Sequence, residues 1–377
     1  MNLKTALADT GLSQRQIAAE LGISTSAVNA LANKGLWPAK DTAAVRGRLV
    51  KLLVDHGLSF MAAFACLPAN ENPSGEGKDT HKMIRKQTLL PATKRAFNIR
   101  RDPFDEVQSA DDLFLSNSIR YVREAMFDTA KHGGMLAVVG ESGSGKSTLR
   151  RDLVDRVRKE DLPILLIEPY VLGMEDNDKR GKTLKALHIA EAILYTVAPA
   201  ERCQSSPEAR FRQVHRVLRD SARAGHKHCL VLEEAHGLSY PSLKHLKRFY
   251  ELEDGFSRLL SIILIGQPEL KHKLAETSAE VREVVQRMEV VEVHPIDDLR
   301  GFAEHRLGKA GLAADKLFAP DAFDALRLKL SGPKERTSGE GASLLYPLVV
   351  GNTLIAGLNM AAALGVDKVS ADIINRV

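Results

Sequence analysis

Hydrophobic and polar positions follow different patterns in different parts of the 377-residue chain. Between residues 97 and 295, short apolar runs alternate with longer segments of helical periodicity, which predicts a parallel β-sheet covered by helices on both faces. The apolar runs are residues 135–139, 163–168, 229–232, 259–265 and 290–293. Residues 1–65 and 296–377 instead show helical periodicity. We therefore expect an α/β core, a small N-terminal helical domain and a C-terminal helical lid that is interrupted by a loop at residues 331–342.

Residues 66–96 have the composition of a basic linker. One proline and two glycines fall within residues 70–78, and residues 78–101 carry eight Lys and Arg against one Asp. Residues 1–65 carry seven basic and four acidic residues, whereas the whole chain has a net charge of +5. The first quarter of the chain is therefore suited to a polyanionic partner, although a solvated charged segment explains the basic run equally well.

Residues 140–148 fit the phosphate-binding pattern G-x-x-x-x-G-K-[S/T]. They follow an apolar run and precede a helical segment, so a chance Gly/Ser turn is disfavoured. Glycines let successive backbone N–H groups face phosphate; Lys146 is expected to reach the β and γ phosphates, and Ser147 to ligate Mg²⁺. ATP and Mg²⁺ are the expected ligands. The expected nucleotide-binding residues are Gly140, Glu141, Ser142, Gly143, Ser144, Gly145, Lys146, Ser147 and Thr148.

Two later apolar runs end in polar residues that suit phosphoryl chemistry. The run at 230–232 is followed by two carboxylates, and we expect Glu233 to hold Mg²⁺ through water and Glu234 to orient or deprotonate the attacking water. Gln267 follows the next run and is expected to contact the γ-phosphate or the attacking water. The alternative is that Gln267 caps the helix that opens at Pro268.

Two arginines precede the last predicted strand. We favour Arg287 over Arg282 as the residue that reaches into a neighbouring subunit's site and neutralises transition-state charge, because Arg287 immediately precedes the strand. A solvated arginine on a helix is the alternative for both. The first interpretation implies a homo-oligomer.

Residues 14–31 have the spacing of a helix-turn-helix. Ala18 lets the two helices approach, Gly22 makes the turn, and Ser13 and Ser24 are the expected N-caps. The residues expected to face DNA are Ser24, Thr25, Ser26 and Asn29. None of them is an arginine suited to guanine, so weak sequence discrimination is expected. A helical hairpin that binds protein or nothing is the alternative.

Taken together, these motifs resemble the AAA+ ATPase superfamily. They are most similar to the DNA-transposition ATPases of Mu-like phages, the Mu B type, and to their ExeA-like relatives. The matching stretches are residues 97, 102–104, 140–148, 230–238, 265–270 and 286–287, with a lid-like tail at 344–362. The helix-turn-helix pattern followed by a basic linker narrows the resemblance to the Mu B type.

The resemblance implies a function and a DNA path. ATP would promote assembly on double-stranded DNA as a ring or helical filament, which would present the target to a partner transposase and stimulate strand transfer; hydrolysis would release it. The DNA path would be lined by Lys179, Arg180, Lys182 and Lys185, although a solvated loop is equally compatible with these residues. The superfamily's lid often supplies an arginine to the γ-phosphate, and residues 351–354 offer none. Hydrolysis is then expected to be slow or to depend on Arg287.

Two other functions fit parts of the sequence. An ATP-switched transcription regulator would use the helix-turn-helix to read one operator. A secretion-assembly ATPase is disfavoured, because no apolar run approaches the length of a membrane span and the helix-turn-helix pattern is present. Three cysteines without C-x-x-C spacing indicate a reducing compartment, so the cytoplasm of a bacterial host cell is expected.

Overall fold

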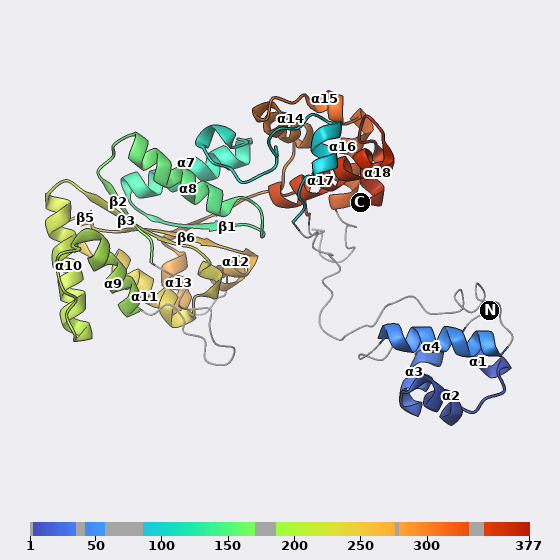
Figure 1. The fold of residues 1–377 in the computed structure, drawn as a ribbon. Helices are drawn as coiled ribbons and strands as arrows, with labels where there is room; N and C mark the ends of the chain where they lie inside the picture. Colours follow the sequence, from blue (N-terminus) through green and yellow to red (C-terminus); the bar gives the residue numbers. More distant parts are fainter. Residues whose placement is uncertain (1–2, 35–41, 57–85, 170–185, 276–278, 332–342) are drawn as a thin grey trace. The chain divides into compact units, whose positions relative to one another are not determined.

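The computed structural model describes residues 3–34, 42–56, 86–169, 186–275, 279–331 and 343–377. The chain divides into two compact units, Met1–Lys82 and Met83–Val377 (Figure 1). Within the described residues, each unit encloses apolar cores of its own.

The first unit contains the helices α1 (Leu3–Asp9), α2 (Gln14–Leu21), α3 (Thr25–Lys34) and α4 (Thr42–Asp55). Both expected N-caps form. The Ser13 hydroxyl accepts a hydrogen bond from Gln16 N in a capping box, and Ser24 Oγ accepts one from Ala27 N at 3.2 Å. Gly22 ends α2 in the left-handed conformation, with φ at 64°, so the turn between α2 and α3 forms where the sequence predicts it.

The second unit is built on a five-stranded sheet in the order β2-β3-β6-β1-β7, in which every pairing is parallel. The strands are β1 (Met135–Val139), β2 (Ile164–Ile167), β3 (Lys227–Leu232), β6 (Ser261–Gly266) and β7 (Met288–Glu292). The central strands β1 and β6 are buried along their whole length, as expected for a parallel sheet covered on both faces. The predicted alternation of strands and helices is therefore confirmed.

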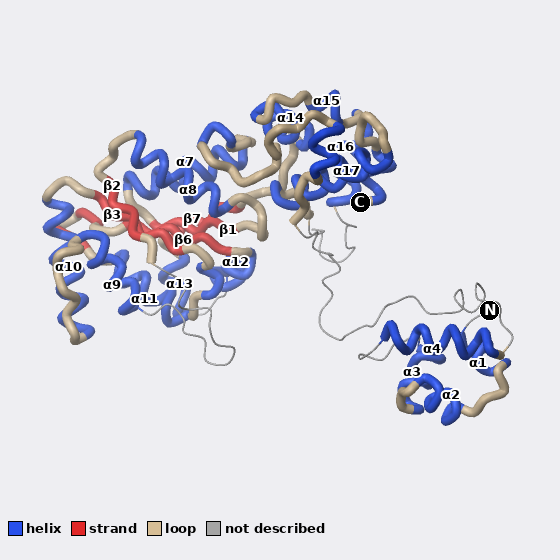
Figure 2. Tube along the Cα trace, in the orientation of Figure 1, coloured by secondary structure: helices blue, strands red, loops and turns tan. Residues whose placement is uncertain are grey.

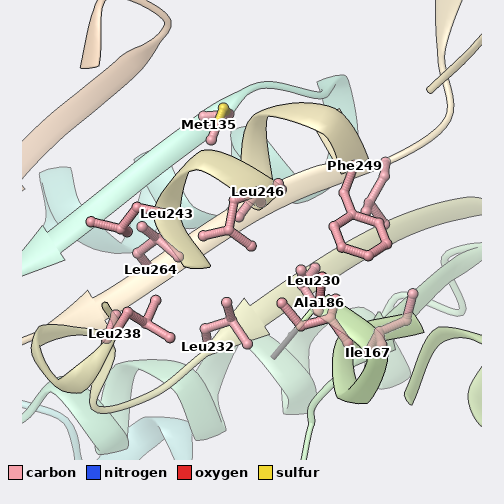
Figure 3. Packing of buried hydrophobic residues seen from close by; sticks show 14 of the residues in the cluster. Met135, Ile167, Ala186, Leu230, Leu232, Leu238, Leu243, Leu246, Phe249 and Leu264 are labelled. Atoms are coloured by element: carbon pink, nitrogen blue, oxygen red, sulfur yellow. The ribbon is translucent and has the colours of Figure 1, made fainter. Parts of the chain in front are cut away.

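Helices cover the two faces of this sheet, as Figures 1 and 2 show. One face carries α7 (Asn117–His132) and α8 (Lys146–Lys159); the other carries α9 (Ala186–Val197), α10 (Pro207–Arg223), α11 (Tyr240–Tyr250), α12 (Pro268–Ala275) and α13 (Ala279–Val285). Alternate residues of each strand enter the two cores: Leu136 and Val138 pack with α7 and α8, whereas Ala137 packs with the opposite group. Figure 3 shows this second core, with Leu232 and Leu264 of the strands near Leu243 and Leu246 of α11.

The C-terminal part of the second unit is helical: α14 (Leu299–Lys309), α15 (Ala314–Leu317), α16 (Pro320–Leu330), α17 (Pro347–Leu364) and α18 (Ala371–Arg376). The short helix α6 (Pro91–Ala96) packs against α17, where Asn359 accepts hydrogen bonds from Leu90 N and Thr93 Oγ1 and donates one to Thr88 O. Residues 86–96 thus lie on the lid, although the sequence suggested that they belong to the linker 66–96. Residues 332–342, within the predicted loop, lie outside the described part of the chain.

Two features of the second unit differ from the sequence-based expectation. A two-stranded hairpin, β4 (Glu253–Asp254) with β5 (Ser257–Arg258), precedes β6. The helix α17 is long and apolar enough to cross a membrane by length and composition, with a mean hydropathy of 1.5, so the expectation that no run approaches this length is wrong. Burial accounts for its composition: half of α17 is buried, and Val350, Leu354 and Leu358 lie in the lid core.

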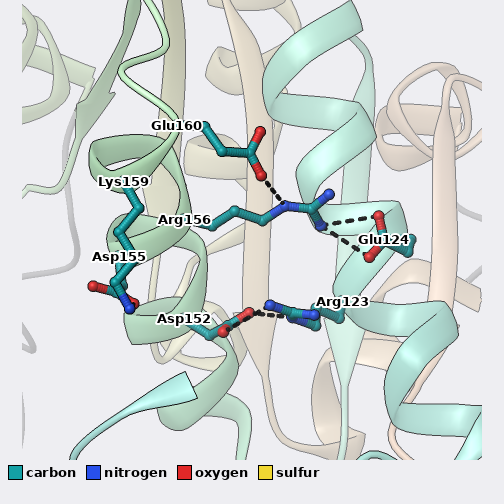
Figure 4. Close-up of polar contacts among 7 residues, drawn as sticks. All are labelled: Arg123, Glu124, Asp152, Asp155, Arg156, Lys159 and Glu160. Carbon is teal, nitrogen blue, oxygen red and sulfur yellow. Dashed lines mark hydrogen bonds and ion pairs between the residues drawn. The ribbon is translucent and has the colours of Figure 1, made fainter. Parts of the chain in front are cut away.

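Ion pairs join α7 to α8, the two helices that cover one face of the sheet (Figure 4). Arg123 of α7 donates to both carboxylate oxygens of Asp152, through Nε at 2.5 Å and Nη2 at 3.2 Å. The Asp152 side chain is only 3% exposed and that of Arg123 24% exposed. Arg156 bonds Glu124 and lies 3.6 Å from the centre of the Phe127 ring. Because Asp152 is buried, its charge depends on Arg123 for compensation.

We expect Asp152→Asn to lower the free energy of unfolding by about 3 kcal/mol, because it leaves the Arg123 guanidinium largely buried without its counter-charge. Asp155→Asn is the matched control on the same helix; its ion pair with Lys159 is exposed, and its removal should change stability by about 0.5 kcal/mol or less. Urea unfolding followed by circular dichroism measures both. Equal effects of the two substitutions would contradict the role given to the buried pair.

Candidate nucleotide-binding site

A cavity of about 370 Å³ lies between the sheet and the lid. Its walls come from the loop after β1, from the ends of β3 and β6, from the segment 104–119 and from the lid helices α14 and α17. The carboxyl ends of β1, β3 and β6 meet here because the three strands are parallel neighbours. The fold thus brings together motifs that lie more than 100 residues apart in the sequence.

The loop after β1 has the geometry of a phosphate cradle. Gly143 and Gly145 adopt positive φ angles of 77° and 97°, and α8 begins directly at Lys146 with no side chain capping its first turn. Backbone N–H groups at this helix start are therefore open to an anion. Ser144 Oγ is buried without a hydrogen-bond partner among the described residues, which fits a hydroxyl that donates to phosphate.

Lys146 is only 8% exposed, and its Nζ donates to Gly140 O and Glu141 O, both at 2.7 Å. Burial lowers the pKa of Lys146, and the nearby carboxylates, Glu234 first among them, oppose this change. An ammonium group has three N–H donors, so one remains beyond the two bonds to the loop. This donor can meet a phosphate oxygen in the cavity.

The two carboxylates after β3 face different surroundings. Glu234 lines the cavity and adopts the left-handed backbone conformation, with φ at 49°. Glu233 does not line the cavity, and its Oε2 lies 3.1 Å from Arg150 Nε. Ser147 of the loop does line it. Glu234 faces the cavity and Glu233 faces Arg150, and this difference is compatible with the different roles predicted for them.

The residues predicted to hold Mg²⁺ are oxygen donors, the ligand type that this ion requires. Among the described residues, no group of three or more His, Cys, Asp or Glu side chains is placed to hold a metal. Mg²⁺ commonly binds through one or two protein oxygens together with substrate phosphates and water. Ser147 and Glu233 fit that mode.

Gln267 follows β6 and lines the cavity. Its backbone O accepts a hydrogen bond from Leu270 N at 2.8 Å, while its backbone N lies 3.5 Å from His236 Nδ1. The backbone of Gln267 therefore opens α12, and its side chain remains available to the cavity. Both roles considered for this residue are compatible with one conformation.

Neither predicted arginine finger lines the cavity of its own chain. Arg287 directly precedes β7, and the start of β7 pairs with the start of β1. Arg287 therefore lies at the amino-terminal ends of the parallel strands, whereas the phosphate loop lies at their carboxyl-terminal ends. Its Nη1 donates to Glu251 Oε1 at 2.5 Å. Arg282 is exposed on α13. Their action on a neighbouring subunit stays a prediction.

The sequence did not predict the cavity-lining residues on the lid side. Three aromatic rings form an apolar wall suited to a flat base, with Phe114 edge-on to Phe302 at 5.7 Å and Phe104 at 6.3 Å from Phe302. Arg306 of α14 donates to Asp105 O and Asp112 O, and burial lowers its pKa, although a guanidinium stays charged. His294 also lines the cavity. Only Phe104 belongs to a matched stretch, 102–104; no motif marks the other positions, because their proximity depends on how the lid packs.

The residues predicted to contact DNA are only partly described. Ser24, Thr25, Ser26 and Asn29 are exposed at the start of α3 in the first unit, as expected. Ser24 Oγ and Ser26 Oγ lie 2.9 Å apart, and Asn29 Oδ1 accepts a hydrogen bond from Asn33. Lys179, Arg180, Lys182 and Lys185 lie outside the described residues.

Comparison with known families covers the part of the chain that carries the phosphate loop. Residues 129–274, which include the phosphate loop, Glu234 and Gln267, match the AAA domain family. This part of the chain therefore has the sequence of an AAA domain. A general secretion pathway protein A of Aeromonas hydrophila is 25% identical over 231 residues, which are 59% of this chain and 37% of that protein. The chain thus matches little more than a third of that relative's length.

Parts of the chain also resemble solved structures. Cdc6p of Pyrobaculum aerophilum is 13% identical with a TM-score of 0.49, and the match covers 72% of this chain and 68% of that one. The ORC2 protein of Aeropyrum pernix is 18% identical with a TM-score of 0.43, covering 73% and 71%.

We expect Arg306→Met to weaken binding of a fluorescent ATP analogue about tenfold in this AAA+ domain. The substitution keeps an apolar stem but removes the charge-assisted bonds that join α14 to the segment 105–112 across the cavity. Lys309→Met, on the exposed side of the same helix, is the control and should bind like the wild type. Equal affinities of Arg306→Met and the wild type would show that this bridge does not shape the site.

Proposed function

We propose that this chain hydrolyses ATP to control its assembly on target double-stranded DNA, which it binds without strong sequence preference. In this proposal the assembled protein delivers the DNA to a partner transposase and stimulates it, in the cytoplasm of a bacterial host. The observation that carries the ATPase part is the convergence of Lys146, Glu234 and Gln267 on one cavity. The DNA and transposase parts rest on the sequence resemblance and on the exposed start of α3.

The cavity residues have different roles in hydrolysis. Lys146 and the N–H groups at the start of α8 bind the phosphates, and Gln267 orients the attacking water or the γ-phosphate. Glu234 accepts a proton from that water. Bound Mg²⁺ would neutralise developing phosphate charge, held by Ser147 and, through water, by Glu233. Arg287 acts in a neighbouring subunit of the ring or filament. It lies at the amino-terminal ends of the strands, away from the cavity of its own chain.

The DNA-binding part of the proposal is supported by two features. The first unit exposes small polar side chains at the start of α3, the place from which a recognition helix reads a groove. These side chains suit backbone and water-mediated contacts more than base discrimination. The basic segment 78–101 adds charge for phosphates. DNA binding is therefore expected to weaken strongly as salt is raised.

A secretion-associated ATPase is the second candidate. Similarity to the general secretion pathway protein A of Aeromonas hydrophila favours it, and the similar part spans the AAA domain. This candidate predicts that nucleotide-dependent assembly needs no DNA. An ATP-switched transcription regulator, the third possibility, predicts tight binding to one DNA sequence and no large assembly on random DNA. Sedimentation of the purified chain with random duplex DNA separates the three.

We expect Lys146→Ala to weaken ATP binding about 10- to 100-fold and to abolish ATP-dependent assembly on random duplex DNA, because the principal phosphate cation is lost. Arg158→Ala, on the exposed end of the same helix, is the control. Sedimentation without nucleotide, with ADP and with a non-hydrolysable ATP analogue reports assembly. If Lys146→Ala assembles with wild-type affinity, ATP is not the switch.

Glu234→Gln should bind ATP normally but hydrolyse it about 10²- to 10⁴-fold more slowly, because the amide cannot accept the proton. Assembled complexes should then persist after ATP addition, whereas the wild type dissociates as ATP is consumed. Glu269→Gln removes a carboxylate that is near Lys146 but does not line the cavity, and it should behave like the wild type. Rapid turnover by Glu234→Gln would place the catalytic base elsewhere.

A further inference from the structure

Arg150 connects the ends of two neighbouring strands beside the nucleotide site. It lies one turn after Lys146 on α8, so both side chains leave the same face of the helix. Its Nη1 donates to Glu168, directly after β2, and its Nε lies 3.1 Å from Oε2 of Glu233, directly after β3. No sequence motif assigns a role to Arg150 or Glu168.

The surroundings of this guanidinium show that Glu233 is its second partner. The Arg150 side chain is 23% exposed, and its Nε is buried without a well-aligned hydrogen bond among the described residues. The Glu233 carboxylate is the charge that this Nε faces. An arginine fork always carries its proton and has five donors in a plane, so it can hold two carboxylates at once.

Glu233 needs such a partner because of its length. A glutamate has one more rotatable bond than an aspartate between the backbone of the strand and the carboxylate. Each additional torsion must be ordered before the oxygens can serve a metal ion. The contact of 3.1 Å between Arg150 Nε and Oε2 of Glu233 supplies this order.

We propose that Arg150 is a positioning residue that fixes the Glu233 carboxylate for Mg²⁺ and thereby offsets the conformational freedom of this long side chain. Glu168 binds Nη1 of the same guanidinium, so the orientation of Arg150 is fixed by two carboxylates. The inference rests on the proposed ATP and Mg²⁺ binding of this site. It gives the ion pair a function beyond joining β2, β3 and α8.

The test measures how binding of a fluorescent ATP analogue and ATP hydrolysis depend on Mg²⁺ concentration. Arg150→Met should raise the Mg²⁺ concentration for half-maximal response about tenfold, the usual effect of losing a residue that orients a metal ligand. Affinity for the analogue in EDTA should not change. Glu168→Gln, which keeps Arg150 but loosens its anchor, should raise the Mg²⁺ requirement two- to threefold. Arg158→Met, the same substitution at the exposed end of α8, is the control.

A double-mutant cycle distinguishes an effect of Arg150 on the position of the Glu233 carboxylate from an effect on the stability of the fold. With Glu233→Asp, which has one torsion fewer, Arg150→Met should shift the Mg²⁺ requirement by no more than about threefold. An equal shift in both backgrounds would overturn the proposal, because a structural defect does not depend on the length of residue 233. A lowered Mg²⁺ requirement in Arg150→Met would also overturn it, since the arginine would then compete with the metal.

These outcomes differ from a failure of the proposed function. If the wild-type chain binds no ATP analogue, the ATPase proposal fails before Arg150 is tested. If the wild type binds the analogue in a Mg²⁺-dependent way and Arg150→Met has the same dependence, only the positioning role is wrong. Thermal unfolding of each variant shows whether it is folded, and Glu168→Gln provides the test should Arg150→Met unfold.

Discussion

The parallel pairing of β1 with β6 determines where the phosphate loop lies relative to Gln267. Val139 at the end of β1 pairs with Gly266 at the end of β6, and the next residue continues the ladder, since Gly140 N donates to Gly266 O at 3.2 Å. A slip of one residue would turn each buried side chain of β1 towards the opposite core. Because both faces are packed, the register is fixed. The phosphate loop and Gln267 therefore emerge side by side.

This register also sets the electrostatics of the site. The apolar strands end where the cavity begins, so charged groups stand at the boundary between a dry core and solvent. Lys146 lies on the buried side of that boundary and is held by two loop carbonyls, whereas the side chain of Glu234 is 52% exposed. A cation that is fixed and a carboxylate that can move suit binding and proton transfer, respectively.

Sequence patterns predicted the parts of the molecule that depend on local chemistry. The apolar runs predicted the sheet strands, and the phosphate-loop pattern predicted a loop followed by a helix, because both follow from residues close together in the chain. The helix begins at Lys146, within the motif and two residues before the predicted start. The lid side of the cavity could not be predicted in this way. Arg306 and Phe302 lie on α14, more than 150 residues from the phosphate loop, and only packing brings them to it. The same limit applies to Arg150, whose partners end two different strands.

The helix α17 has the composition of a membrane span but packs in the core of the lid. Its N-terminal end reaches the phosphate loop, where Leu348 N donates to Gly143 O at 3.3 Å, and a Cβ at Gly143 would lie 2.6 Å from Leu348 Cβ. Further along, Asn359 binds the segment that includes α6. One buried helix thus contacts both the nucleotide loop and the stretch of chain that leads back to the first unit. Because close-packed interiors transmit strain, the contacts of α17 connect the packing of α6 to the phosphate loop.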